Sequence, residues 1–281
     1  MAHDHTIPQR WEHYTAQDHA VWKTLFERQT ALLPGLACAE FVEGMRHLPI
    51  SAQGIPNFAE LNDVLKPQTG WQVVAVPGLV PDEVFFEHLA NRRFPSGNFI
   101  RGANQLDYLQ EPDVFHDVFG HVPMLMHPVM ADFIQMYGEA GLRAQRIGKL
   151  TELARVYWYT VEFGLVKEVV NGAQALRIYG AGIASSFTES VYAVQSASPH
   201  RIGFELERVM RTNYRIDDFQ ESYFVLDSLD DLLGLARIDF APVYERLNHG
   251  PSYQPGDVLP TDTVLHRGSG AYHCAHTAVS A

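Results

Sequence analysis

The most constraining feature of this sequence is a pair of histidines, five residues apart, in the apolar stretch PDVFHDVFGHVPMLM that begins at Pro112. Residues five apart on a regular α-helix are rotated by about 140°, so His116 and His121 cannot both point at one atom from such a helix. Gly120 and Pro123 weaken regular helix at this point. We therefore predict a helix that starts at Pro112 and is irregular or ends near Gly120, so that His121 turns back toward His116.

The surroundings of this pair leave two interpretations open. Asp113 lies three residues before His116, near enough to accept a hydrogen bond from its ring, as outer partners of metal-bound histidines do. Alternatively, both histidines belong to the core and bond to backbone carbonyl groups. The stretch alone does not decide between a metal site and a structural pair.

A buried acid favours the metal. The segment VYWYTVEFGLV, residues 156–166, is hydrophobic all round, which predicts a buried helix, and Glu162 is its only acid. A buried carboxylate costs several kcal/mol unless a cation accompanies it, and no Lys or Arg lies within one helical turn. A metal ion meets that need, although a Glu that reaches solvent or a distant Arg partner would also do so.

Two histidines and one carboxylate hold either zinc in a hydrolase or ferrous iron in an oxygenase. The H-E-x-x-H pattern of zinc peptidases is absent from the chain. Aromatic residues surround Glu162, which suits a flat apolar substrate or cofactor, or else ordinary core packing. They are Tyr157, Trp158, Tyr159 and Phe163. Three ligands on one face leave octahedral positions open for oxygen, so the pattern favours iron.

The remaining patterns predict a mainly α fold with a few short β-strands. A Thr15-x-x-Asp18 box opens the first long helix, which stops at Pro34-Gly35. Further helices are expected over residues 57–66, 81–93, 128–148, 150–170, 185–196, 204–212 and 230–247. Strands are expected over 71–78 and 92–102, with a strand and turn over 175–183. We expect one catalytic domain, 1–247, followed by a loosely packed or partly disordered tail, 248–281.

Charge and composition restrict the partners. The formal net charge of −12 disfavours nucleic acid and anionic membrane surfaces. No apolar run reaches the length of a membrane helix, and the N-terminus shows no secretory pattern. The only two cysteines, Cys38 and Cys274, make a disulfide framework improbable and favour a cytoplasmic protein.

The stretch EPDVFHDVFGHVPML followed by YWYTVEFGL resembles the pterin-dependent aromatic amino acid hydroxylases, and the resemblance runs from about Trp71 to Asp239. The chain is most similar to the bacterial members, which act on phenylalanine as free-standing catalytic domains, so the resemblance implies a monomer. It also implies Fe(II) bound by His116, His121 and Glu162, with tetrahydrobiopterin or a related reduced pterin as cosubstrate. The expected reaction converts L-phenylalanine and O2 to L-tyrosine through a ferryl-oxo intermediate, the start of phenylalanine catabolism.

The resemblance also assigns residues to the substrate. Arg101 is expected to bind the substrate carboxylate, and the ring is expected to pack among Pro112, His116 and Trp158. Two further positions, Gly182 and Ser185, are expected to lie near the amino acid.

On the pterin side, the matching positions are Gly78, Val80, Asp82, Phe85 and Tyr157, with Phe85 as the stacking ring. Two departures from the family pattern bear on the substrate. Leu109 replaces a threonine near the substrate amino group, and Ile216 replaces an acid of the tyrosine enzymes. Ile216 and Trp158 together favour phenylalanine. A zinc hydrolase with the same ligands, or a protein that only binds an aromatic amino acid, are the alternatives.

Overall fold

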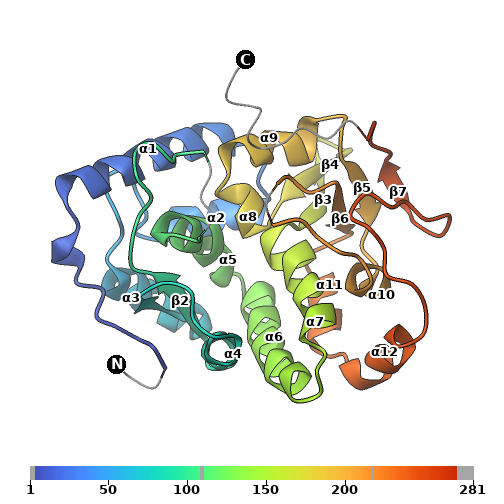
Figure 1. Ribbon diagram of the computed structural model, residues 1–281. Coiled ribbons are helices and arrows are strands. Elements are labelled where there is room, and N and C mark those ends of the chain that lie inside the picture. Colours follow the sequence, from blue (N-terminus) through green and yellow to red (C-terminus); the bar gives the residue numbers. More distant parts are fainter. Residues whose placement is uncertain (1–3, 108–110, 217, 271–281) are drawn as a thin grey trace.

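The computed structural model describes residues 4–107, 111–216 and 218–270, and these residues form a mainly helical fold with two small sheets (Figure 1). This confirms the expected fold class. Leu109 and the tail residues 271–281 lie outside the described residues.

The helices run in the following order along the chain. They are α1 (Ala16–Leu32), α2 (Ala39–His47), α3 (Phe58–Thr69), α4 (Asp82–Ala90), α5 (Val122–Leu125), α6 (Pro128–Arg146), α7 (Leu150–Tyr157), α8 (Ala181–Ala184), α9 (Phe187–Gln195), α10 (Leu206–Met210), α11 (Asp231–Ala236) and α12 (Phe240–Leu247). A short 3₁₀ helix, Trp11–His13, precedes them. There are also two π-helices in the described ranges. The first, Phe115–His121, leads directly into α5, and the second, Trp158–Glu162, directly follows α7.

The strands form two sheets. Parallel strands β1 (Gln72–Val76) and β2 (Arg93–Gly97) flank α4 in the chain and pair with each other. The second sheet has the order β4-β3-β6-β5-β7 and contains β3 (Leu165–Val170), β4 (Ala173–Ile178), β5 (His200–Gly203), β6 (Ser222–Leu226) and β7 (Val264–His266). In Figure 1 the two sheets lie on opposite sides of α6 and α7.

Local sequence signals explain several boundaries. The Thr15 hydroxyl accepts from the backbone N–H of Asp18, whose carboxylate accepts in return, so the predicted capping box is present. Asn57 caps α3 by accepting from the backbone N–H of Ala59. Helix α3 ends at Gly70, which adopts a left-handed conformation with φ 78°.

The prediction of one helix over 150–170 is wrong in its second half. Helix α7 ends at Tyr157, the π-helix ends at Glu162, and Leu165–Val170 form strand β3, which pairs antiparallel with β4. The turn between these strands is Asn171-Gly172, with φ values of 52° and 80°. Asn-Gly is the characteristic dipeptide of a two-residue hairpin, and with the β-branched valines it outweighs the helical pattern.

The predicted helix over 230–247 is in fact two helices. Helix α11 ends at Ala236, and Asp239 begins α12 by accepting from the backbone N–H of Ala241. An Asp at this position satisfies the free amide groups of a new helix, which explains the break.

The segment that follows α12 is attached to the body as far as it is described. Strand β7 pairs antiparallel with β5, and the buried Arg208 guanidinium binds Asp262 with an Nε–Oδ1 distance of 2.9 Å. The described part of the tail, 248–270, therefore contacts the body at β7 and at Asp262, while none of its residues is fully buried. No helix in the described ranges is both long and apolar enough to cross a membrane.

Candidate metal centre and ligand cavity

The two histidines lie on one face because their helix is a π-helix. Residues Phe115–His121 adopt this form, in which backbone bonds join residues five apart rather than four. His116 and His121 are therefore neighbours along one face, and helix continues past Gly120 into α5. The predicted start at Pro112 is wrong, since the helical conformation begins at Val114, and the helix does not end near Gly120. The alternative prediction of an irregular helix that brings His121 back toward His116 is confirmed.

Packing on the opposite face holds this helix in place. The rings of Phe115 and Phe119 stack with centroids 4.8 Å apart, and they meet Trp22 and Phe26 of α1 edge-on. Gly120 serves close packing, because a Cβ there would lie 2.8 Å from the carbonyl oxygen of Ala181. The apolar face thus fixes the direction in which the histidines point.

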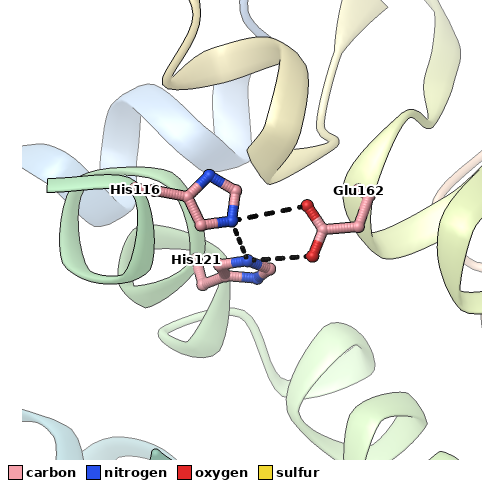
Figure 2. Close-up of side chains that lie close together, drawn as sticks. All are labelled: His116, His121 and Glu162. Atoms are coloured by element: carbon pink, nitrogen blue, oxygen red, sulfur yellow. Dashed lines mark hydrogen bonds and ion pairs between the residues drawn. The ribbon is translucent and has the colours of Figure 1, made fainter. Parts of the chain in front are cut away.

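Glu162 completes a group of three donor atoms. It ends the second π-helix, and its Oε1 lies 3.2 Å from Nε2 of His121 while its Oε2 lies 3.6 Å from Nε2 of His116 (Figure 2). The two Nε2 atoms are 3.3 Å apart, and all donor atoms lie within 4.8 Å of one another. Ligands about 2.1 Å from a cation and at right angles are about 3.0 Å apart, so these spacings fit a metal ion.

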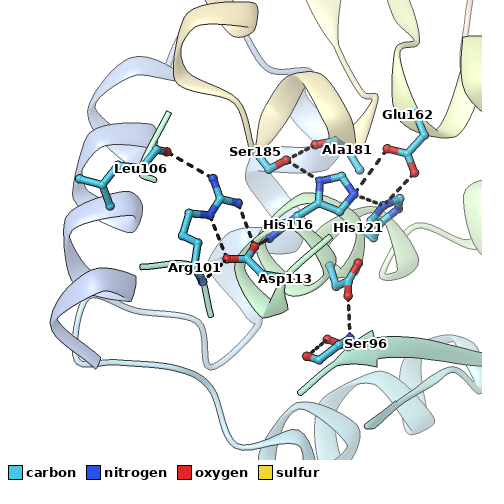
Figure 3. A network of polar contacts seen from close by, with 11 residues as sticks. Ser96, Arg101, Leu106, Asp113, His116, His121, Glu162, Ala181 and Ser185 are labelled. Atoms are coloured by element: carbon cyan, nitrogen blue, oxygen red, sulfur yellow. Dashed lines mark hydrogen bonds and ion pairs between the residues drawn. The ribbon is translucent and has the colours of Figure 1, made fainter. Parts of the chain in front are cut away.

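A serine sets the tautomer of His116. The Ser185 hydroxyl donates to the carbonyl oxygen of Ala181 at 2.8 Å and lies 3.0 Å from Nδ1 of His116 (Figure 3). Its single hydrogen is already used, so it accepts from Nδ1–H, and the lone pair of Nε2 is left facing Glu162. Burial lowers the pKa of His116 to about 4, which keeps the ring neutral as a metal ligand requires.

The buried charges around the centre follow from their partners. Burial opposes ionisation of Glu162, but the facing His121 and His116 outweigh it, and the pKa of Glu162 lies below its usual value. Burial raises the pKa of Asp117 to about 7, although its Oδ2 accepts from the backbone N–H of Gly97 at 2.7 Å. The centre therefore holds one carboxylate, Glu162, whose ionised form is favoured by the facing histidines.

Arg101 and Asp113 form a buried ion pair beside the metal centre. The Nε and Nη2 atoms of Arg101 donate to the two oxygens of Asp113 at 2.9 and 2.8 Å, and both side chains are buried (Figure 3). Asp113 also accepts from the backbone N–H of His116, at 3.0 Å, and not from its ring. The expected contact between Asp113 and the ring is thus replaced by Ser185.

One cavity brings the substrate-side residues together. It has a volume of about 230 Å³ and opens beside His116 and Glu162. The predicted substrate residues that line it are Arg101, Pro112, His116, Trp158, Gly182 and Ser185. Ile216 also lines it and is exposed. A Cβ at Gly182 would lie 3.1 Å from Oε2 of Glu162, so glycine keeps the third ligand unobstructed.

The predicted pterin residues lie outside this cavity, and one of them, Tyr157, contacts His121 of the centre. Phe85 of α4 meets Tyr157 edge-on, with centroids 5.9 Å apart, and Tyr157 stacks on His121 at 6.4 Å. Gly78 lies on the loop before α4, where a Cβ would approach Glu111 Oε1 to 2.6 Å. Val80 is half-buried on the same loop, and Asp82 is the exposed first residue of α4. Their half-buried aromatic surface is chemically suited to a flat heterocycle.

Sequence reasoning missed two glutamates of the cavity wall, Glu111 and Glu189, and of these Glu189 is buried. Glu189 follows the N-cap Ser186 by three residues, so in sequence it is indistinguishable from an acid that stabilises a helix N-terminus. No periodicity separates it from such an acid.

The fold and the centre define a class of protein, and most of the chain matches that class. A family model for the biopterin-dependent aromatic amino acid hydroxylases matches residues 2–247, and the chain belongs to this family. It is 59% identical over 266 residues to a phenylalanine-4-hydroxylase of Ralstonia nicotianae, covering 95% of this chain and 84% of that protein. A protein of the same name from Caulobacter vibrioides is 59% identical over 272 residues, with 97% and 91% covered.

Solved structures of phenylalanine hydroxylase from Chromobacterium violaceum are similar in fold. The form with iron and phenylalanine has a TM-score of 0.88 at 52% identity and covers 94% of this chain and 95% of that chain. The form with iron(III) and 7,8-dihydrobiopterin has a TM-score of 0.88 at 54% identity, with 94% of both chains covered. The predicted family is thereby confirmed.

Proposed function

We propose that this chain hydroxylates L-phenylalanine to L-tyrosine with O2, using Fe(II) on His116, His121 and Glu162 and a reduced pterin. The observation that carries the proposal is the cluster of three donor atoms within 4.8 Å, placed at the wall of a cavity sized for one small ligand. The relatives named phenylalanine-4-hydroxylase and the iron-, phenylalanine- and dihydrobiopterin-bound structures of the Chromobacterium violaceum enzyme support the choice of substrate and cofactors.

The residues of the chain would bind and orient the amino acid. Nε and Nη2 of Arg101 donate to Asp113, and Nη1 donates to the carbonyl oxygen of Leu106 at 3.3 Å, so the N–H groups that remain on Nη1 and Nη2 form the edge left for a substrate carboxylate. Trp158 lies in the cavity wall, stacked on Tyr214 at 4.4 Å, and presents an aromatic surface to the substrate ring. Pro112 and His116 form the remaining wall, so the ring lies beside the metal ligands.

The same residues would prepare the metal. Bound iron supplies the activation of oxygen together with the pterin, which stacks in our proposal on Phe85 beside Gly78, Val80, Asp82 and Tyr157. Ser185 holds the His116 ring in the tautomer that ligates through Nε2. Burial of His121 and Glu162 keeps water from the ligands.

The test offers phenylalanine, tyrosine and tryptophan separately to Fe(II)-loaded protein with reduced pterin and O2, and the products are identified by chromatography. We expect tyrosine from phenylalanine, restored by Fe(II) and not by Zn(II). Glu162→Gln is expected to abolish turnover in a hydroxylase. In a protein that only binds the amino acid, the wild type would show no turnover, and the variant would bind phenylalanine as the wild type does. Absence of tyrosine with the iron-loaded wild type would overturn the proposal. The monomeric state and the cytoplasmic location stay predictions, the first open to light scattering.

A further inference from the structure

Acidic side chains dominate the cavity beside the metal centre. Those that line it are Asp107, Glu111, Glu162, Glu189 and Asp218. Three of them face positive or metal-binding groups in the structure. Asp107 pairs with Arg28 of α1 at 2.5 Å, Asp218 pairs with Arg215 at 3.7 Å, and Glu162 faces the two histidines. Two acids are therefore left whose charge has no such neighbour.

Of these two, Glu111 is satisfied at the rim. Its Oε1 accepts from the backbone N–H of Leu79 at 3.1 Å, and the Leu79 side chain is exposed. A half-buried carboxylate at such a position is solvated on its outer side and needs no counter-ion. Glu111 thus has a structural explanation in the pterin-side loop.

Glu189 is more deeply buried, and the hydrogen-bond partners that the structure gives it are neutral. Only 7% of it is exposed, its Oε1 accepts from the hydroxyl of Tyr223 at 2.7 Å, and its carboxylate also accepts from the backbone N–H of Gln220. Within the described ranges no cation forms an ion pair with it. Burial raises the pKa of Glu189 to about 7, and the negative charges of Asp218 and Glu162 add to this effect. The cavity wall therefore holds a buried carboxylate that a cation would stabilise.

The substrate of the proposed function supplies such a cation. A free amino acid carries a carboxylate and an α-ammonium group on one carbon atom, and Arg101 offers its free edge to the carboxylate in the same cavity. The cavity volume of about 230 Å³ leaves room for one small ligand, so groups on its wall face the same molecule. The ammonium group needs a negative or neutral acceptor.

We propose that Glu189 binds the α-ammonium group of the amino acid substrate through a carboxylate lone pair that neither Tyr223 nor the backbone of Gln220 occupies. This inference rests on the proposed function, because it takes an amino acid as the ligand. It makes Glu189 the residue that selects an amino acid over an aromatic acid lacking the amino group. Tyr223 then orients the carboxylate and leaves its charge intact.

The test compares two ligands that differ in one group, L-phenylalanine and 3-phenylpropanoate, by calorimetric binding to metal-loaded protein without pterin. Glu189→Gln is expected to weaken phenylalanine binding about 10- to 100-fold and to leave 3-phenylpropanoate unchanged, since a hydrogen bond between charged groups is lost for one ligand only. The glutamine can still accept from Tyr223, so the wall is preserved. Tyr223→Phe is expected to keep the preference for phenylalanine, because the carboxylate remains.

Two results separate this inference from the proposed function. Wild type that converts phenylalanine to tyrosine while Glu189→Gln binds it as tightly as wild type overturns the inference alone. The same holds if Glu111→Gln, and not Glu189→Gln, removes the preference for phenylalanine. Wild type that neither binds nor converts phenylalanine overturns both.

Discussion

Replacement of Ser185 by alanine tests how the fold prepares His116 for a metal. The change removes the only acceptor that the structure gives to Nδ1–H of His116, in a part of the site where the ring is mostly buried. A buried donor left unpaired costs about 1–3 kcal/mol. The ring can then also adopt the other tautomer, which places the proton on the ligating Nε2. Loss of such an outer partner weakens metal binding by about 10- to 100-fold, or about 1.4–2.8 kcal/mol, so the two magnitudes agree.

The assay titrates metal-free Ser185→Ala with Fe(II) under anaerobic conditions, or with Co(II), and follows heat or absorbance. Ser186→Ala is the matched control, because Ser186 caps α9 by accepting from the backbone N–H of Glu189 at 3.4 Å and does not contact a metal ligand. The control is expected to lose about 1 kcal/mol of stability at most and to keep its metal affinity. Wild-type metal affinity in Ser185→Ala would refute the assignment of the tautomer.

Three further predictions concern stability, each measured by urea unfolding. Gly120→Ala is expected to cost about 1–3 kcal/mol, because its Cβ would lie 2.8 Å from a carbonyl oxygen, whereas Gly234→Ala, with open space around it in α11, should be neutral or stabilising by up to about 1 kcal/mol. Asp113→Asn is expected to cost about 3–5 kcal/mol, since it leaves the buried charge of Arg101 without its partner; a loss under 1 kcal/mol would contradict this. Glu189 has a folded pKa of about 7, above its usual 4.5, so the stability that its protonated form contributes is present below pH 4.5 and is lost as the pH rises through 7. The free energy of unfolding of Glu189→Gln should therefore rise relative to that of the wild type between pH 4.5 and 7. A difference that stays constant with pH would contradict this prediction.

The sequence predicted the three donor residues of the centre because their chemistry is local. A buried acid without a nearby base, such as Glu162, is visible in a run of apolar letters, and so is a repeated histidine. The capping box at Thr15 and the N-cap at Asn57 were equally visible, since each depends on residues within one turn. Such features need no knowledge of what lies across the fold.

Features that depend on distant contacts could not be predicted in this way. Gly120 and Pro123 indicate an irregular helix at this point, but they do not indicate the π-helical form of Phe115–His121, which packs against α1 and α8. Glu189 acquires its place in the cavity wall only when β6 brings Tyr223 beside α9. The strand Leu165–Val170 is different, because the sequence does contain its turn signal, Asn171-Gly172. The prediction of a helix over 150–170 rested on the apolar pattern alone and ignored this dipeptide.

Because the segment is a π-helix, the number of residues between His116 and His121 also determines how the helix that follows is oriented. Deleting one residue between His116 and His121 would leave them four apart, the spacing that keeps two ligands together on an ordinary α-helix. If the segment relaxed to that form, the metal ligands would stay paired, but everything after them would turn by about 100° about the helix axis. Val122–Leu125, now buried, would then present a different face to the core. The one residue that the π-helix has beyond an α-helical turn therefore does two things. It keeps His116 and His121 on one face, and it directs the apolar side chains of α5 into the core.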